Sequence, residues 1–521
     1  MAARRGRAGT IAAGALPATL ALVLACGSPP PQRPAPPPRP ERRTVILSSE
    51  YDDRRVGDEA TADLVAQLGL VQDPGPVSLV DEVGRRLLAA APPRPFDYRF
   101  AVVDQWSPNA FTLPGGAIFV SRGLLALTNS EDELACVLGH EITHAAERHA
   151  AAQQQVARSN PFLIGFAGAA WLAAYARDQE RVADRGGQLM CAQVGYDPAA
   201  LSDVLRALGD SERLEVGASR LPSFLETHPG AVERAAATSA TAQGLGHTPR
   251  PGVTRDRTDY LGRLVGLVTG ANPAEGVFVG SRFLHPDLGF AVSFPDGWTQ
   301  VNTPAAVGTL APDRDARISL ELDGMGNDPK AAADRFFATD PAAALARVES
   351  EQAVTIGGLP AWEVQGSVPV QGGTLAGQIT WIAFQGRVYR VSWAAPSFAA
   401  KKYMGRARAS TRSFRAITPE EREQVKVSRI ALARAEDGET LPELLRRTGA
   451  SSDVERIALL NRLQSSARLE SGQLVKIVVE QPYAGPLAAP RVAPAPAADR
   501  AKAKPRPKPP ATAPATGRPR G

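Results

Sequence analysis

The sequence of 521 residues has no long apolar run in its interior. A membrane-spanning helix needs about 20 consecutive apolar residues, whereas the longest interior candidate, Pro161 to Ala176, has 16. That segment is better interpreted as a buried or interfacial helix. The composition therefore disfavours an integral membrane protein.

Aromatic residues are scarce, at 6% of the chain, and they are not interleaved with basic side chains. The formal net charge of +5 arises at the two ends of the chain. Three arginines lie within the first seven residues, and eight Lys or Arg accompany one Asp after Pro490. Without interleaved aromatic residues or a recognition-helix pattern, these charges do not indicate nucleic-acid binding. The tail, residues 482–521, is predicted to be disordered and able to touch anionic cell wall or lipid.

The first 25 residues are interpreted as a targeting segment. After a basic start, Ile11 to Ala25 is apolar but too short for a lasting membrane span. The segment ends in Val23-Leu24-Ala25-Cys26, which resembles a bacterial lipobox. The resemblance implies cleavage before Cys26 and a lipid on its sulfur. Gly27, directly after the cysteine, favours the outer membrane over the inner. Leu24 is larger than usual at its position, so plain secretion is the alternative. Residues 26–45 are Pro-rich and predict an extended tether.

Histidine is also rare, with six in the chain, yet two occur in His140-Glu141-Ile142-Thr143-His144. On a helix, residues four apart share a face, so both imidazoles can bind one zinc ion. Glu141 lies between them, where it can hold a metal-bound water without binding the metal. An N-cap at Ser130, first-turn acids and an apolar stripe predict that a helix over about 130–153 carries this motif.

A catalytic zinc ion needs a third protein ligand. The extended pattern H-E-x-x-H-x-x-G-x-x-H is absent, because Glu147 and Ala150 occupy its last two fixed positions. The best candidate is Glu180 on a second helix, with Asp184 one turn later on the same face. We expect Asp184 to accept a hydrogen bond from a ligand histidine and so fix its tautomer.

Together, the H-E-x-x-H motif and Glu180-x-x-Ala183-Asp184 resemble the HtpX- and BepA-type zinc metallopeptidases, relatives of the CAAX prenyl proteases. The resemblance covers roughly residues 46–245. Further segments that match the family are Asn109–Phe111, Leu113–Gly116, Ile118–Leu124, Gly195–Pro198 and Thr227–Pro229.

The resemblance implies a role for several residues. The implied ligands of a single zinc ion are His140, His144 and Glu180. Glu141 is the implied general base, and His228 matches a histidine that can reach the zinc as a fourth, inhibitory ligand. Arg234 is expected to pair with an active-site acid, and His149, five residues past His144, is expected to be structural. We expect substrate contacts from the segment before the active helix, at Asn109, Phe111, Gly115 and Gly116.

Two of the three cysteines flank the candidate site. Cys136 lies one turn before His140, and Cys191 three turns after Glu180. Two separate buried thiols are expected, although a disulfide is permitted in a secreted protein.

Residues 50–95 show helical periodicity and predict helices that wrap the active helix. Residues 98–103 and 117–120 alternate like strands. If one of them is an exposed edge, an extended substrate can pair with it through main-chain hydrogen bonds. Such pairing favours unfolded or loop substrates over a narrow sequence.

A change to Gly, Thr, Pro and Arg around 245–255 indicates a domain boundary. A short helix is expected within 256–270. The unit 256–417 alternates like an α+β sandwich, with helices predicted over 329–339 and 341–348. It faintly resembles PsbP-like domains. Because it has no metal cluster, nucleophile pair or phosphate loop in its sequence, we interpret it as a binding or spacing domain.

Residues 426–480 predict a small third unit. Asp437-Gly438-Glu439-Thr440-Leu441 leads into a helix to about Thr448, and Ile457–Asn461 and Leu469–Ile477 follow. This pattern resembles a LysM module, a βααβ fold that binds N-acetylglucosamine-containing glycans such as peptidoglycan. An unrelated small α/β cap is the alternative.

The chain is therefore predicted to be an α+β multidomain protein. A mainly helical zincin-type protease domain with a small sheet, residues 46–250, precedes the sandwich and the LysM-like module. The predicted function is a zinc endopeptidase, lipid-anchored on the periplasmic side of the cell envelope, that cleaves unfolded or misassembled envelope proteins. The alternatives are a non-proteolytic chaperone or scaffold and a peptidoglycan-binding lipoprotein. Retention of Glu141 speaks against a catalytically inactive protein.

Overall fold

The computed structural model describes residues 50–149, 177–214, 223–250, 252–340, 343–370, 373–451 and 453–485. Several predicted features lie outside these ranges, namely the targeting segment, Cys26 and its tether, the stretch Pro161–Ala176 and the tail beyond residue 485. Within the described part of the chain, no helix has the length and apolar character that a membrane crossing requires.

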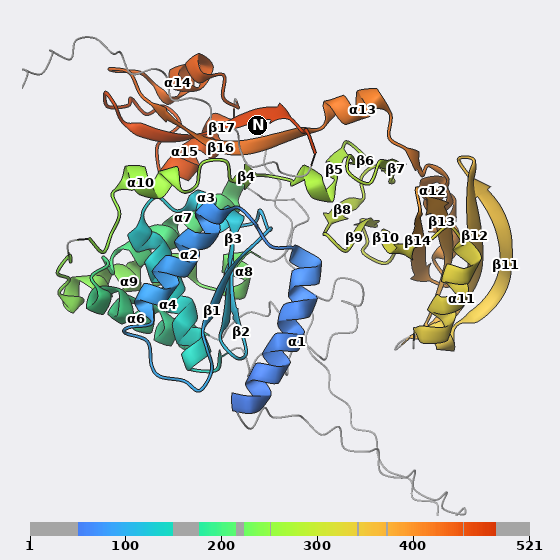
Figure 1. Ribbon diagram of the computed structural model, residues 1–521, viewed down its shortest axis with the longest axis horizontal. Coiled ribbons are helices and arrows are strands. Elements are labelled where there is room, and N and C mark those ends of the chain that lie inside the picture. The colour runs from blue at the N-terminus through green and yellow to red at the C-terminus, as the bar shows by residue number, and fades with distance from the viewer. Residues whose placement is uncertain are drawn as a thin grey trace, which may run out of the picture. The chain divides into compact units, whose positions relative to one another are not determined.

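A three-stranded sheet lies near the start of the described chain, with helices on both faces (Figure 1). Its strands are β1 (Arg99–Val103), β2 (Ala110–Leu113) and β3 (Ala117–Ser121), in the order β1-β3-β2. Side chains alternate along β3. Ile118 and Val120 therefore face helices α2 (Pro74–Leu87) and α4 (Glu131–Ala146). Ala117 and Phe119 pack with α1 (Glu50–Leu68) on the other face. Of the helices that were predicted to wrap the active helix, α2 therefore packs against α4, whereas α1 covers the opposite face of the sheet.

Helix α4 carries the metal-binding motif, and both of its ends are fixed by side chains. At its start, Ser130 Oγ accepts a hydrogen bond from the Glu133 backbone N–H at 3.3 Å. The helix ends at Ala146, and Arg148 adopts a φ of 55°, which L-residues rarely do. Arg148 Nη2 donates to Asp53 Oδ1 of α1 at 2.9 Å, which holds the turn in place. The helix predicted to extend to residue 153 is therefore too long.

Helix α6 (Arg177–Val194) packs against α4 at a point where the two backbones meet. A Cβ atom at Gly187 would lie 2.6 Å from the backbone nitrogen of His140, and one at Gly139 would lie 3.0 Å from the Gly187 carbonyl oxygen. Only glycine permits such a close approach. The helices run antiparallel, because His140 lies beside Asp184 and His144 beside Glu180. Their polar faces therefore oppose each other.

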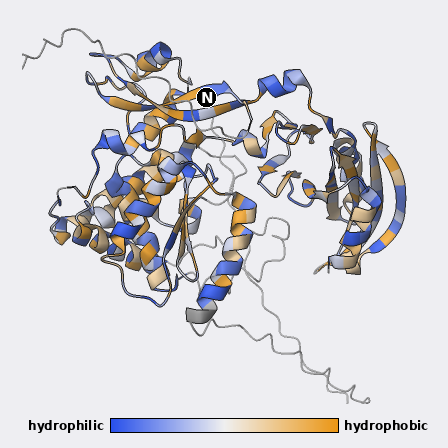
Figure 2. Cartoon of the chain, in the orientation of Figure 1, coloured by the Kyte–Doolittle hydropathy of each residue, from blue (hydrophilic) through white to orange (hydrophobic). Residues whose placement is uncertain are grey.

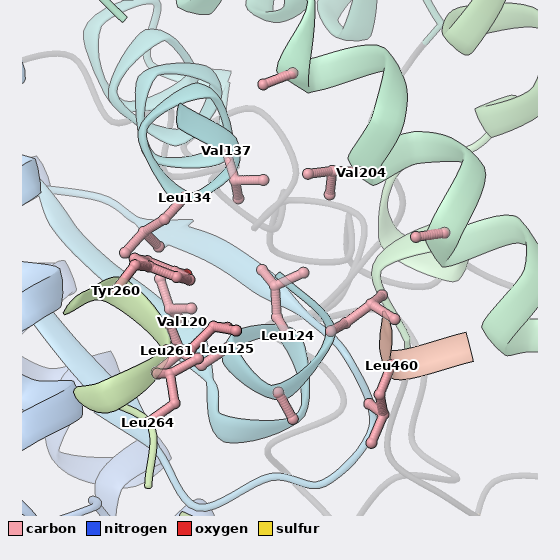
Figure 3. Packing of buried hydrophobic residues seen from close by; sticks show 14 of the residues in the cluster. Val120, Leu124, Leu125, Leu134, Val137, Val204, Tyr260, Leu261, Leu264 and Leu460 are labelled. Carbon is pink, nitrogen blue, oxygen red and sulfur yellow. The ribbon is translucent and has the colours of Figure 1, made fainter. Parts of the chain in front are cut away.

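The remaining helices of this part of the chain surround α4. They are α3 (Arg122–Leu127), α7 (Ala200–Leu214), α8 (Phe224–Thr227), α9 (Ala231–Leu245) and α10 (Arg257–Gly262). Figure 3 shows side chains from α3, α4, α7 and α10 in one apolar cluster. Tyr260, Leu261 and Leu264 belong to this cluster. The second unit, predicted to start at 256, therefore begins later.

The second unit contains two antiparallel sheets, consistent with the predicted α+β class. One has the order β11-β12-β13-β14-β10-β9-β8, and the other β15-β7-β6-β5. The strands are β5 (Val277–Val279), β6 (Arg282–His285), β7 (Phe290–Ser293), β8 (Thr299–Asn302), β9 (Ala306–Leu310), β10 (Arg317–Met325), β11 (Arg347–Ile356), β12 (Leu359–Val370), β13 (Gly373–Phe384), β14 (Arg387–Pro396) and β15 (Arg415–Ala416).

Two helices of this unit test the sequence prediction. The helix predicted over 329–339 is present as α11 (Pro329–Thr339), and α12 (Ala400–Arg412) follows β14. The prediction of a helix over 341–348 is wrong. A 3-10 turn, Ala343–Leu345, leads directly into β11 there. Strand β11 is an edge strand and is exposed on both faces along most of its length, so it lacks the apolar alternation that identifies a strand.

The C-terminal unit follows the short helix α13 (Pro419–Gln424). Its elements are β16 (Lys426–Arg434), α14 (Leu441–Thr448), α15 (Val454–Asn461) and β17 (Leu474–Pro482). The two strands pair antiparallel, and β4 (Val268–Thr269) joins β16 on its other side. Figure 2 shows hydrophobic colouring along much of β16 and β17. The order is strand, helix, helix, strand, while the LysM resemblance stays a prediction.

Candidate metal centre

The two motif histidines lie side by side inside the protein. His140 and His144 are one helical turn apart on α4, and neither side chain is exposed to solvent. Their Nε2 atoms lie 3.0 Å apart. The helical spacing thus brings two nitrogen donors to one point, as predicted.

Glu180 brings a carboxylate to the same point from α6. Its Oε1 lies 3.3 Å from His144 Nε2, and its Oε2 lies 3.7 Å from His140 Nε2. Burial alone would raise the pKa of Glu180, but nearby His228 and hydrogen bonds from His144 and His228 hold it well below its usual range. The carboxylate is therefore ionised, which is the form that binds a metal.

His228, just after α8, supplies a fourth donor. Its Nδ1 lies 3.0 Å from Glu180 Oε1 and 3.3 Å from His140 Nε2. The ring stacks on Phe224, with centroids 4.1 Å apart, and its Nε2 lies 3.3 Å from the Ala110 carbonyl oxygen. His228 is thus held in the cluster from both ends of its ring.

The donor set fits a tetrahedral zinc ion. Zinc–ligand bonds of about 2.0–2.1 Å require ligand atoms about 3.3–3.4 Å apart at tetrahedral angles. The five separations given above run from 3.0 to 3.7 Å. Nitrogen and carboxylate donors at these distances suit zinc, and the four residues form a group able to hold one ion.

Two further side chains, Asp184 and Arg234, contact the donors and orient them. Asp184 Oδ1 lies 3.0 Å from His140 Nδ1, as predicted for a residue that fixes a ligand tautomer. Arg234 donates to both oxygens of Asp184, at 2.6 and 2.8 Å, and also pairs with Glu180. Arg234 thus contacts two carboxylates of the candidate site.

Glu141 occupies a distinct position beside the donors. Its side chain is fully buried, and both carboxylate oxygens lack a hydrogen-bond partner among the described residues. The nearest basic group is His228 Nε2, 3.6 Å from Oε1. Burial raises the pKa of Glu141, and His228 and His140 offset this only in part. A buried carboxylate without a partner is suited to exchange a proton with a small ligand.

The comparison with known families agrees with this geometry. The sequence profile of peptidase family M48 matches residues 78–242. The chain carries an M48 metallopeptidase domain. All four donors and Glu141 fall within the matched residues.

Curated relatives match part of the chain. The beta-barrel assembly-enhancing protease of Yersinia pestis is 28% identical over 231 residues, which are 40% of this chain and 46% of the relative. The mitochondrial metalloendopeptidase OMA1 of Schizosaccharomyces pombe is 27% identical over 211 residues, 37% of this chain and 61% of the relative. The chain thus spans about half the length of the curated relatives it matches.

Solved structures also resemble part of the chain. Cyanobacterial PsbP from Synechocystis sp. PCC 6803 covers 28% of this chain and 98% of its own, with 16% identity and a TM-score of 0.23. That score is too low to support a fold assignment, so the PsbP resemblance stays a prediction.

The four residues expected to contact substrate have packing roles in the M48 domain. Phe111 stacks on Phe119, with centroids 5.3 Å apart, on the α1 side of the sheet and away from Glu141. Cβ atoms at Gly115 and Gly116 would lie 2.8 Å from Arg54 Cα and 2.5 Å from the Phe96 ring. These glycines serve a tight turn under α1. Contact of these three residues with substrate stays a prediction.

Asn109 precedes β2 and is fully buried. Its backbone N–H donates to Ser121 Oγ at 2.8 Å, and its Oδ1 accepts from Thr227 Oγ1 at 3.4 Å. Asn109 thus ties the start of β2 to the segment that carries His228. This is a positioning role, and direct contact with substrate stays a prediction.

The two cysteines of the M48 domain are buried free thiols. Cys136 Sγ lies 3.3 Å from the Asp197 carbonyl oxygen, to which it donates. Burial, with a smaller effect of Cys191, raises the pKa of Cys136 well above its usual range. Both thiols are buried and pack in the core of this domain.

Two contacts of the site were not predicted from the sequence. His149 lies beyond the end of α4. Its Nδ1 is 2.9 Å from Nδ1 of His144, so it contacts one of the metal-binding histidines. Phe224 stacks on His228. The family resemblance singled out His149 without this contact, and Phe224 belongs to no motif, so only the folded chain shows the two contacts.

Proposed function

We propose that the chain is a zinc-dependent endopeptidase that cleaves unfolded or misassembled cell-envelope proteins. The observation that carries the proposal is the convergence of His140, His144 and Glu180 beside Glu141, a buried carboxylate whose oxygens have no hydrogen-bond partner among the described residues. The M48 domain supports the same reaction class. A zinc ion held by these residues would polarise a carbonyl group and lower the pKa of water.

The chain's own residues account for proton transfer. Glu141 accepts a proton from the attacking water and delivers it to the leaving amine. Asp184 and Arg234 keep His140 and Glu180 oriented throughout.

His228 is proposed to regulate the site. A zinc ion with four protein ligands has a closed shell, whereas a catalytic zinc ion needs an open position. With His228 in the cluster, all four positions are protein donors. We propose that His228 leaves the cluster when the substrate carbonyl enters, so that the arrangement with four protein donors would be a latent state.

The small sheet supports the proposed substrate class. Among the described strands, β2 pairs only with β3, so its other edge carries no strand, although the side chains of β2 are buried. Thr112 Oγ1 on β2 donates to the Glu141 carbonyl oxygen at 3.0 Å, which places this strand beside the general base. A substrate chain added to β2 would be read through main-chain hydrogen bonds, which favours unfolded segments.

The envelope location is supported by two independent observations. The N-terminal sequence resembles a lipobox at Cys26. The Yersinia relative is named a beta-barrel assembly-enhancing protease, and β-barrels of that kind lie in the outer membrane. We propose a lipid-anchored protein on the periplasmic side, with misassembled envelope proteins as its substrates.

Digestion of casein tests the proposed reaction. The chain from residue 27 onward is assayed with zinc, after chelation, and after zinc is restored. We expect cleavage that disappears on chelation and returns with zinc, and slower cleavage of a compact folded protein. Zinc-bound protein that protects casein from aggregation without cleaving it would favour the chaperone alternative.

A second candidate role concerns the C-terminal unit. Its strand–helix–helix–strand order supports the LysM resemblance and hence peptidoglycan binding. We expect the full chain to sediment with purified peptidoglycan and to be released by soluble N-acetylglucosamine oligomers. Sedimentation that the oligomers do not reverse, but that salt abolishes, would assign it to the basic tail.

A further inference from the structure

The first turn of α4 is held by three different parts of the chain. Glu131 accepts hydrogen bonds from Tyr196 Oη at 2.9 Å and Arg255 Nη1 at 2.8 Å. Asp132 Oδ1 accepts from the Asp197 backbone N–H at 2.9 Å. The third acid, Glu133, is bound by the C-terminal unit. These acids therefore do more than favour the helix dipole.

Arg462 makes the contact with Glu133 across 329 positions of sequence. Both terminal nitrogens of its guanidinium bond the carboxylate, one of them at 2.7 Å. Glu133 Oε2 also accepts from the Asn129 backbone N–H at 2.8 Å. Arg462 follows α15 with φ 54° and ψ 43°, a conformation that non-glycine residues rarely adopt. A left-handed residue at this position ends the helix.

Lys476 of β17 holds the turn that precedes α4. Its side chain is fully buried, and Nζ donates to the carbonyl oxygens of Ala126 at 2.7 Å and Thr128 at 2.8 Å. These are terminal carbonyls of α3, which a helix leaves without internal partners. Asn129 Nδ2 also donates to the Leu460 carbonyl oxygen at 2.9 Å.

Apolar contacts surround these polar ones. Leu444, Ile457 and Leu460 of the C-terminal unit belong to the same buried cluster as Leu124 of α3 and Leu134 of α4. Figure 3 shows Leu460 in this cluster with residues of α3 and α4. The C-terminal unit therefore completes the core of the M48 domain and is not a freely tethered module.

We propose that the C-terminal unit, residues 426–482, is a clamp that positions the metal-binding helix, with Arg462 as its main positioning residue. His140 lies two turns beyond Glu133, and a helix transmits a shift of its first turn along its axis. Metal donors must be held within about 0.5 Å of their working positions. Without Arg462, the buried Glu133 carboxylate loses its charged partner, and the first turn of α4 must move to rehydrate it.

The test compares two arginines of the C-terminal unit in the full chain. Arg462→Met removes the bond to α4. Arg447→Met removes a similar two-nitrogen bond, to Glu439 at 2.7 and 2.8 Å, that stays inside the unit. Zinc affinity is measured by competition with a chromophoric chelator, and donor geometry by the visible absorption of the Co²⁺-substituted protein. Neither readout requires that the chain be a protease.

We expect Arg462→Met to weaken zinc binding about tenfold or more and to change the intensity of the Co²⁺ bands. Arg447→Met should leave both unchanged, and Arg462→Lys should restore part of the affinity. Zinc binding within twofold of wild type and an unaltered Co²⁺ spectrum in Arg462→Met would overturn the proposal.

A milder variant covers the case in which Arg462→Met does not fold. Glu133→Gln keeps the side-chain shape but removes its charge. We expect faster amide hydrogen exchange along residues 131–144 and a weaker zinc affinity. Unchanged exchange and affinity in Glu133→Gln would likewise overturn the clamp.

Discussion

Asp184 Oδ1 lies 3.0 Å from Nδ1 of His140, on the side of the imidazole opposite the metal-facing Nε2. This contact fixes which nitrogen carries the proton and leaves Nε2 as the donor. We predict that Asp184→Asn weakens zinc binding by about 10–100-fold, as measured by chelator competition. Asp178→Asn is the matched control, because Asp178 lies on the same helix, is exposed and pairs with Arg181. Equal affinities for the two variants would contradict the assignment.

The fourth donor predicts an activating mutation. Replacing His228 with Ala opens one position while His140, His144 and Glu180 still bind the metal. Casein cleavage by His228→Ala should rise several-fold at equal zinc content. His247→Ala, which removes a histidine that contacts the Gly195 carbonyl oxygen, should not change the rate. A lower rate in His228→Ala with zinc still bound would show that His228 assists catalysis.

The close contact between α4 and α6 predicts that alanine substitutions at two glycines, Gly187 and Gly209, have different effects on stability. Gly187→Ala places a methyl group 2.6 Å from the His140 backbone nitrogen. The helices must separate, at a cost of about 1–3 kcal/mol in the free energy of unfolding, and zinc affinity should fall with it. Nothing lies within 4 Å of a Cβ at Gly209 of α7. Gly209→Ala should therefore be neutral or stabilise by about 0.5–1 kcal/mol, as measured by urea unfolding.

Metal binding should be visible in stability as well as in activity. Four buried donors converge in the folded chain, and a ligand that binds only the native state stabilises it by about 2.7 kcal/mol at 100 times its Kd. The Tm should therefore fall on chelation and recover with zinc. In Glu180→Ala, which removes one donor, this zinc-dependent shift should shrink strongly. A full shift in that variant would place the zinc elsewhere.

The sequence predicted the centre of the site because helical spacing is local. His140 with His144, and Glu180 with Asp184, are pairs four residues apart, so one rule places each pair on a single face. That these two faces meet was implied by family resemblance, and the Gly139–Gly187 contact supplies the physical reason. His149 was expected to share the helix of His144, but Arg148 ends that helix first.

The remaining features depend on contacts that no local pattern encodes. Strand β11 has no alternation because it is an exposed edge, so residues 341–348 were misread as a helix. The bond between Glu133 and Arg462 joins positions 329 residues apart. In the sequence, the helix dipole is enough to explain an acid in the first turn of a helix. Only the tertiary structure shows that Glu133 is bound by Arg462.

The most direct test of the central claim compares wild type with Glu141→Gln. Both proteins are loaded with zinc, their zinc content is measured, and casein cleavage is followed in the same samples. Because Glu141 is not one of the donors, both should bind one zinc ion per chain, and only the wild type should cleave. Equal cleavage by the two zinc-loaded proteins would contradict the assignment of Glu141 as general base and the mechanism built on it.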